Sequence, residues 1–392
     1  TEFGLWISID GGQTWASFKG DKFPAVAVRD LVIQPRDNDL VIGTHGRGIW
    51  IIDDITPLRT LSTDLMSREA AFVTARPVQQ RISGPGGWAN GAAVFVGENP
   101  PGGAVLTYYQ RTRHLFGPLK LEILDPSGRV VDELPASKRR GLNRVEWSMR
   151  EKPPHVPPAV QLAFAGTQGP RVLPGTYTAR MTKGGQVYEQ KFDVGLDRRA
   201  TFTVEQRKQQ YDAAMRVHRL FGEETAVLDR IQQLRAGVAA AGANTAVDAA
   251  TKTKLAAFEA KLDDVRKRIV ATKEGGAITG EERLREHTDL LYGAIMGYEG
   301  APSDYQVERI GVLEAELADI EQQFEALVAA DLPAVNKALQ DAAQQPLAVP
   351  AKVPAMADAG ISSANAHWLS TRKRKDRKSM FHSLPQDTVR LR

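Results

Sequence analysis

GLWISIDGGQTW, residues 4–15, is the stretch that decides how the N-terminal part of this chain folds. It places Ser8, Asp10, Gly12, Thr14 and Trp15 at the spacing S-x-D-x-G-x-T-W. This spacing predicts a closed turn between two strands, because an aspartate accepts hydrogen bonds from turn amides and a glycine permits positive φ. Trp15 would then pack beneath the turn. The alternative is that Asp10 is a catalytic carboxylate.

The stretch is repeated, since residues 4–10 align with residues 48–54, 44 positions later. A period of about 40–50 residues in a strand-rich sequence indicates propeller blades. Runs at 28–34 and 40–44 predict two further strands between the copies. The second copy has lost the pattern, with Ile52, Thr56 and Arg59 at the serine, second glycine and tryptophan positions, as expected where a repeat array ends.

These residues resemble the Asp-box, or BNR, repeats of sialidase-like and sortilin-like β-propellers. The resemblance implies that residues 1–61 are the last blade or blades of a propeller. It places the Asp-box on the outer rim of a blade, away from the central pocket, where its role is structural. It also implies a bacterial protein that is secreted or periplasmic. The expected partners of this fragment are then the missing propeller blades of its parent chain.

Thr44-His45-Gly46-Arg47-Gly48 is the one polar cluster of this region that suggests binding. His45 and Arg47 would point toward the mouth of the propeller and bind an anionic or sugar ligand. The alternative is a solvated turn between strands.

Residues 62–103 are rich in glycine and proline and are interpreted as a linker. Short alternating runs follow in residues 104–200, separated by turns such as 125–128 and 184–185, and predict an immunoglobulin-like or fibronectin-like β-sandwich. Trp147 would lie in its core, the alternative being stacking on a sugar. Residues 153–158, rich in proline, are expected to be a loop insertion.

The period becomes helical in residues 201–345, where apolar residues recur every three or four positions. The pattern predicts four helices with continuous apolar seams in an antiparallel all-α bundle. Capping boxes are expected at Thr203, Thr279 and Ser303. The seams comprise Leu220, Glu224, Val227, Ile231, Leu234 and Val238, then Leu255, Phe258, Leu262, Val265 and Ile269, then Leu284, Leu291 and Ile295, and then Ile310, Leu313, Leu317, Ile320, Phe324 and Leu327.

Residues 346–392 are expected to be a disordered basic tail. The formal net charge of +4 comes from this end, because residues 372–392 contain eight Lys/Arg and two Asp/Glu. The rest of the chain gives no electrostatic reason to expect nucleic acid. A basic nucleic-acid patch and a shifted reading frame are the alternatives for the tail. The chain has no cysteine and no apolar run of the about 20 residues that span a membrane.

The sequence therefore predicts a multidomain chain: the end of an all-β Asp-box propeller, an Ig-like sandwich and a helical bundle. We expect a non-catalytic part that supports or extends a propeller binding a carbohydrate or peptide ligand, with no catalytic residue, metal or cofactor. The alternative is part of a glycoside hydrolase, sialidase-like or another exo-glycosidase, whose catalytic residues lie on other blades. A glycosidase needs two carboxylates about 5–10 Å apart, and residues 1–61 offer no such pair.

Overall fold

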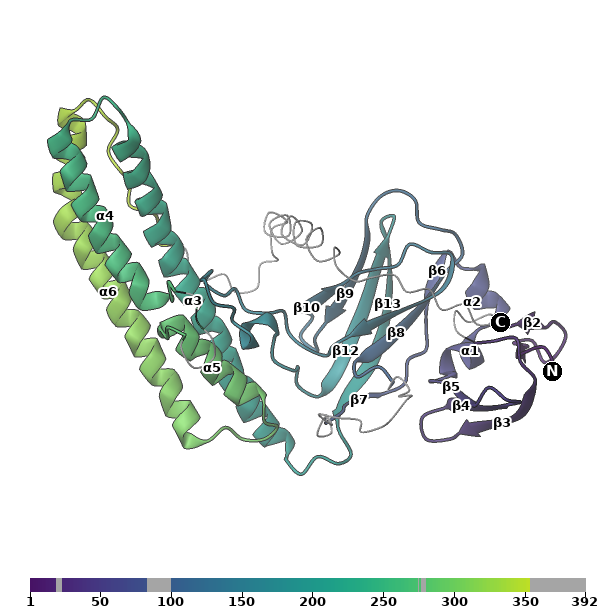
Figure 1. Ribbon diagram of the computed structural model, residues 1–392. Coiled ribbons are helices and arrows are strands. Elements are labelled where there is room, and N and C mark those ends of the chain that lie inside the picture. Colours follow the sequence, from purple (N-terminus) through teal and green to yellow (C-terminus); the bar gives the residue numbers. More distant parts are fainter. Residues whose placement is uncertain (19–22, 83–99, 274, 276–279, 353–392) are drawn as a thin grey trace, which may run out of the picture.

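The computed structural model of this protein describes residues 1–18, 23–82, 100–273, 275 and 280–352. Figure 1 shows three regions in chain order: small N-terminal sheets, a pair of larger sheets and a group of long helices. The predicted succession of β-rich regions and a C-terminal helical region is confirmed, and the chain is multidomain. Within the described ranges, no helix is both long and apolar enough to cross a membrane.

The N-terminal region contains five strands in two separate antiparallel sheets. The runs predicted as strands at 28–34 and 40–44 are strands, but the four-stranded sheet of a complete blade does not form among the described residues. The first sheet pairs β1 (Trp6–Ile7) with β2 (Ala16–Ser17), and the second has β4 (Asp39–Thr44) between β3 (Val28–Gln34) and β5 (Ile49–Ile52). Two short helices follow, α1 (Thr56–Thr60) and α2 (Thr63–Ser67).

Both faces of the β3–β4–β5 sheet expose apolar side chains. Leu31, Val32 and Ile33 are consecutive in β3, and all three are at least 42% exposed. Because successive side chains of a strand point to opposite faces, neither face of the sheet is fully covered. Ile49 and Ile51 of β5 are 75% and 59% exposed. Ile42 of β4 is buried and Trp50 of β5 packs on Phe23, so the described residues cover this apolar sheet only in part.

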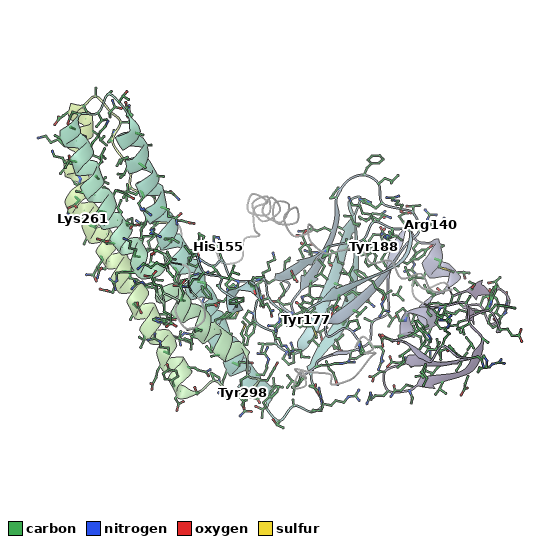
Figure 2. All side chains as sticks on the ribbon, viewed as in Figure 1. Arg140, His155, Tyr177, Tyr188, Lys261 and Tyr298 are labelled. Carbon is green, nitrogen blue, oxygen red and sulfur yellow. The ribbon has the colours of Figure 1, made fainter. Side chains whose placement is uncertain are left out.

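The middle region consists of two sheets that face each other across one apolar core. Trp147 is fully buried there, with its ring centroid 5.2 Å from that of Tyr177 and 6.0 Å from that of Phe192, which confirms the core position and excludes stacking on a sugar. Tyr177 lies among these strands in Figure 2. One sheet has the order β11 (Gly141–Trp147), β8 (Ala104–Gln110), β6 (Ala70–Val73), and the other has β10 (Val130–Leu134), β9 (Leu119–Leu124), β12 (Gly175–Lys183), β13 (Gln186–Leu196), β7 (Val78–Gln80).

The segment predicted as a linker, 62–103, supplies an edge strand to each sheet. β6 pairs antiparallel with β8, and β7 pairs parallel with the end of β13. The sandwich thus begins near residue 70 rather than 104. These strands have only four and three residues, too few for an alternating pattern to stand out beside the glycine-rich sequence that follows.

The helical region has four helices around a second, separate core. Apart from Leu327, which is partly buried, every residue of the predicted seams is buried. The predicted capping boxes at Thr203 and Ser303 are present. Thr279 lies outside the described residues. The third helix starts after it, and there the Glu286 carboxylate accepts a hydrogen bond from the Arg283 amide at 3.2 Å. The helices are α3 (Val204–Ala243), α4 (Ala249–Ile269), α5 (Leu284–Met296) and α6 (Asp304–Asp341).

The connection between β11 and β12 packs against the helices instead of forming a free loop. It contains the short 3-10 helix η1 (Ala165–Thr167), and Figure 2 shows His155 beside the helical region. The Thr225 hydroxyl of α3 donates to the His155 carbonyl at 2.7 Å, and Val156 packs on the helical core. This connection therefore ties the sandwich to the helices.

Glu151, at the start of this connection, is buried and ion-paired. Its carboxylate accepts two hydrogen bonds from Arg129, at 2.8 and 3.1 Å, and one from the Tyr211 hydroxyl of α3 at 2.6 Å. Arg129 follows the turn after β9, so one carboxylate joins the sandwich, the connection and the first long helix.

The first residues of the predicted tail run along the helices. The Leu347 amide donates to Asn336 at 2.7 Å, and Arg230 donates to the Pro350 carbonyl at 3.1 Å. Leu347 and Pro350 are therefore held against α6 and α3 by hydrogen bonds, unlike the expected disordered tail. Residues 353–392, with the basic cluster, lie outside the described residues.

Glu224 is the unusual member of the helical core because it is a fully buried carboxyl on an apolar seam. The Thr288 hydroxyl donates to its Oε1 at 2.6 Å, while its Oε2 has no hydrogen-bond partner among the described residues. Burial raises the pKa of Glu224 to about 8, the Thr288 hydroxyl and Arg285 acting in the opposite direction and Glu286 in the same one. The protonated form is thus the one that fits the core.

We predict that Glu224→Gln stabilises the protein at high pH only. The raised pKa means that the folded state holds one more proton than the unfolded state between about pH 4.5 and pH 8, so stability falls as pH rises through this window. At about 1.4 kcal/mol per pKa unit, the loss is on the order of a few kcal/mol. Denaturant unfolding at about pH 5 and pH 9 measures it.

The matched control is Glu308→Gln, an exposed glutamate of α6. Glu224→Gln should unfold like the parent at the lower pH and at higher denaturant at the upper pH. An equal change at both pH values, or the same change in the control, contradicts the prediction.

Candidate functional site

The Asp-box forms a closed hydrogen-bonded turn between β1 and β2. One Asp10 carboxylate oxygen accepts from the Ser8 hydroxyl at 2.7 Å and from the Thr14 amide at 2.9 Å, and the other accepts from the Thr14 hydroxyl at 2.5 Å. The Gly12 amide donates to the Ser8 hydroxyl oxygen at 2.8 Å. Gly12 has φ of +93°, which explains the glycine at this position.

These bonds commit Asp10 to the turn. The Thr14 hydroxyl, followed by the Thr14 amide and the Ser8 hydroxyl, lowers the pKa of Asp10 to about 2. A general acid needs a raised pKa, and a nucleophile needs a free oxygen facing its substrate. The geometry thus favours the structural role over the catalytic one.

Trp15 is placed differently from the prediction. Its indole N–H donates to the Gly12 carbonyl at 3.1 Å, so the ring lies against the turn, but the residue is 60% exposed. It rests on one side of the turn instead of packing beneath it, because no other described element covers the ring's outer face.

We predict that Asp10→Ala lowers the melting temperature without affecting any binding by the protein, because it removes the acceptor that closes the turn. The lowered pKa sets the pH dependence: the stabilisation is present above about pH 4 and is lost as pH falls through about 2. Thermal unfolding of Asp10→Ala is compared with that of Asp30→Ala, an exposed aspartate in β3. If Asp10→Ala and the parent have the same melting temperature, Asp10 does not have the structural role proposed for it.

His45 and Arg47 lie in a tight turn between β4 and β5. The Thr44 hydroxyl donates to the Gly48 carbonyl at 2.6 Å, and the Trp50 indole donates to the Arg47 carbonyl at 3.0 Å. Both His45 and Arg47 are exposed. Two cavities lie elsewhere in the chain, a groove on the sandwich and a smaller cavity beside the helices, and neither residue lines either of them. Their assignment as ligand-binding residues stays a prediction.

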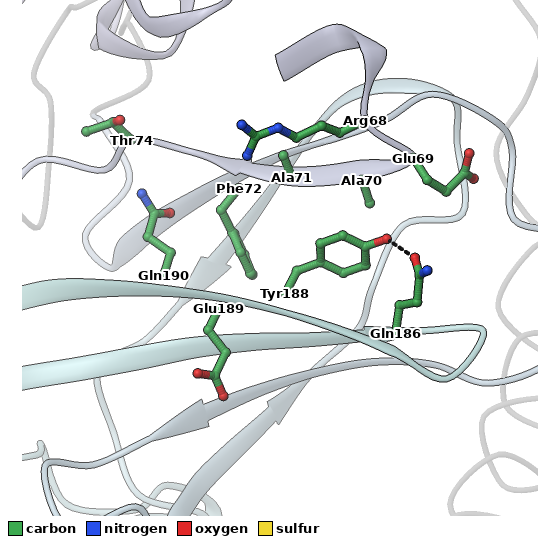
Figure 3. A pocket seen from close by; sticks show the side chains of 10 residues that line it. All are labelled: Arg68, Glu69, Ala70, Ala71, Phe72, Thr74, Gln186, Tyr188, Glu189 and Gln190. Atoms are coloured by element: carbon green, nitrogen blue, oxygen red, sulfur yellow. Dashed lines mark hydrogen bonds between the residues drawn. The ribbon is translucent and has the colours of Figure 1, made fainter. Parts of the chain in front are cut away.

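The larger of these two cavities is a groove of about 580 Å³ on the sandwich, between β6 and β13. Figure 3 shows Phe72 of β6 opposite Tyr188 and Gln190 of β13. A volume of this size falls within the about 300–1,000 Å³ of typical ligand pockets. Sequence reasoning missed the groove because its residues come from strands far apart in the chain, with no local motif.

The groove exists because the chain crosses from one sheet to the other at this edge. β6 belongs to the β8 sheet, whereas β7, directly after Pro77, pairs with Val194, Gly195 and Leu196 at the end of β13. Within the described residues, positions 186–193 of β13 have no strand partner on the β7 side. Their outward backbone groups therefore take part in no sheet ladder among the described strands, and an extended ligand could pair with such an edge.

The side chains of the groove offer an aromatic surface and polar groups. The Tyr188 hydroxyl donates to Gln186 at 2.6 Å, and burial raises its pKa. The Gln190 Oε1 atom is buried and accepts no hydrogen bond from any described residue. An aromatic ring beside an unused acceptor suits a ligand that has both apolar parts and N–H or O–H donors.

The groove is poorly suited to acid–base chemistry. Its Glu69 accepts from Lys183 at 2.7 Å, from the Thr112 hydroxyl at 2.5 Å and from Arg111 at 3.2 Å. The hydrogen bond from Lys183, followed by that from Thr112, lowers the pKa of Glu69 to about 2. A glycosidase acid needs the opposite shift, so Glu69 is unsuited to be that proton donor.

Within the described ranges, no group of three or more His, Asp or Glu side chains is placed to hold a metal ion.

Comparisons with known proteins add little. No protein-family model and no curated protein matches the chain. Among solved structures, the chain is similar to CopC from Methylosinus trichosporium OB3b, with 14% identity and a TM-score of 0.18, over 34% of this chain and 99% of that one. A score this low supports no argument about fold or function.

Proposed function

We propose that this chain is a ligand-binding, non-catalytic part of a bacterial Asp-box propeller protein of the sortilin-like type, secreted or periplasmic. The observation that carries the proposal is the Asp-box itself, whose serine, aspartate and threonine are joined by hydrogen bonds that close the turn. The apolar faces of the β3–β4–β5 sheet support it, because neighbouring blades of a propeller would cover them.

In this proposal the middle region is an Ig-like module that adds a second binding surface to the propeller. The groove beside β13 is that surface. Its open strand edge favours an extended peptide, which would add to β13 by main-chain hydrogen bonds and place apolar side chains on Phe72 and Tyr188. A carbohydrate is the other ligand class, and the aromatic ring and the Gln190 acceptor are compatible with it.

A library of short displayed peptides and a glycan array, both probed with the chain, test the ligand class. Hits from the peptide library that lose at least about tenfold in affinity on Tyr188→Ala support the proposal, a factor of ten being about 1.4 kcal/mol. Tyr305→Ala, an exposed tyrosine of α6, is the control. Hits on the glycan array alone would replace the peptide by a sugar, and no hit in either would reject the groove as a binding surface.

The second candidate is part of a glycoside hydrolase, favoured by the S-x-D-x-G-x-T-W spacing shared with sialidases. We predict background rates from this chain with a panel of aryl glycosides that includes a sialoside. The reason is that Asp10 in the Asp-box and Glu69 in the groove have strongly lowered pKa values, whereas Glu224, whose pKa is raised, is fully buried away from both. Turnover that disappears on mutating any carboxylate of this chain would establish the hydrolase instead.

A further inference from the structure

A second, much smaller cavity lies where the sandwich meets the helices. It is bordered by Arg150, which follows β11, by Arg171, which precedes β12, and by Arg207 in the first turns of α3. Glu299, between α5 and α6, is the acidic residue of its wall. Three guanidinium groups around one carboxylate leave two positive charges uncompensated by the residues that line the cavity.

The carboxylate is already used by one of the three arginines. Arg171 donates to one Glu299 oxygen at 2.5 Å, and the other oxygen is 3.7 Å from Arg207 Nε, beyond hydrogen-bond distance. Arg150 donates to the Gly169 carbonyl at 2.9 Å, which provides a partial charge only. Glu299 therefore neutralises Arg171 better than it neutralises the other two.

Arg207 is the most constrained of the three. It is 2% exposed, and its terminal Nη2 donates to the carbonyls of Arg171 and Val172. Its buried Nε makes no hydrogen bond within the described part of the chain. A buried donor left unpaired is costly, and Glu299, 3.7 Å from Nε, supplies a counter-charge without a hydrogen bond.

The electrostatics of the cavity agree with this geometry. Burial lowers the pKa of Arg207 and of Arg150, with the neighbouring Arg171 acting in the same direction and Glu299 in the opposite one. Guanidinium groups nevertheless keep their proton in proteins, so the site retains its positive charge and needs an anion rather than deprotonation.

We propose that this cavity binds one small monovalent anion, chloride in size, which bridges Arg150 and Arg207 and fastens the sandwich to the helices. The cavity has about 10 Å³ for the centre of a water-sized particle, which is the lower limit for one such particle. A monatomic ion is therefore the largest anion it can hold, and the arginine side chains must move slightly apart to admit chloride. An organic carboxylate or a phosphate has more atoms than this space admits. The proposal is independent of the propeller and of the ligand groove.

Thermal unfolding of the chain in sodium chloride and in sodium gluconate at equal ionic strength tests the proposal. Gluconate screens charge equally but is too large for the cavity. We expect the melting temperature to rise with chloride until the site saturates, because a ligand that binds only the folded state stabilises it. Equal melting temperatures in the two salts at every concentration would overturn the site.

Variants locate the effect. Arg150→Gln should abolish the difference between the salts, whereas Arg198→Gln, an exposed arginine after β13, should keep it. Glu299→Gln removes the competing carboxylate, so half-saturation should occur at a lower chloride concentration than in the parent. An unchanged difference in Arg150→Gln contradicts the site.

Chlorine NMR keeps the test decisive if Arg150→Gln does not fold. Exchange with a bound site broadens the chloride line, and the parent chain should broaden it in proportion to protein concentration. Added bromide, which fits a site of the same chemistry, should narrow the line again. A line width that bromide leaves unchanged would contradict the proposal.

Discussion

Glu151 is the buried acceptor on which the arrangement of the two large regions depends. Its carboxylate receives Arg129 from the sandwich and Tyr211 from α3, so the sheets and the helices share one charged hydrogen-bond network. Removing one partner of a buried ion pair is far more costly than replacing the whole pair by apolar groups. The Glu151 network is therefore specific as well as stable: the observed orientation pairs its carboxylate with Arg129 and Tyr211, and other orientations leave a buried charge unpaired.

Polar groups at this joint between the sandwich and the helices add to the apolar contacts that the connection makes with the helical core. The two apolar cores are separate, and the connection between β11 and β12 spans the distance between them, with Val156 on the helical core and Glu151 in the network. Arg150, next to Glu151, turns the other way to the arginine-rich cavity. Adjacent residues thus serve two different charge networks at one boundary.

The fold was predictable from sequence where a pattern is long and local. The seams of the helical region predicted the helices because an apolar residue every three or four positions over several turns is typical of a helix with one buried face. Even Glu224 was correctly placed on the buried side. The turn of the Asp-box was predictable because its hydrogen bonds join residues at most four apart. Trp15 was not, because the exposure of a ring depends on distant elements.

The groove and the joint could not be predicted from the sequence either, because both are formed by residues that lie far apart in the chain. β6 and β7 are too short for a pattern, and only their pairing with β8 and β13 reveals that the chain changes sheets near Pro77. The arginines of the joint are far apart in the chain, from Arg150 to Arg207, and look like ordinary surface charges in the sequence. Burial, which the sequence does not state, is what distinguishes them.

The length of α3 gives this joint a mechanical consequence. The helix has 40 residues, which at 1.5 Å per residue makes it about 60 Å long, and it starts at the joint. Figure 1 shows the helical region extending away from the sheets along this axis. A rotation of about 5° at the joint would displace the far end of α3 by about 5 Å on this length. The helices thus have the geometry of a lever arm: a small change of angle at the joint would be enlarged at the distant tip.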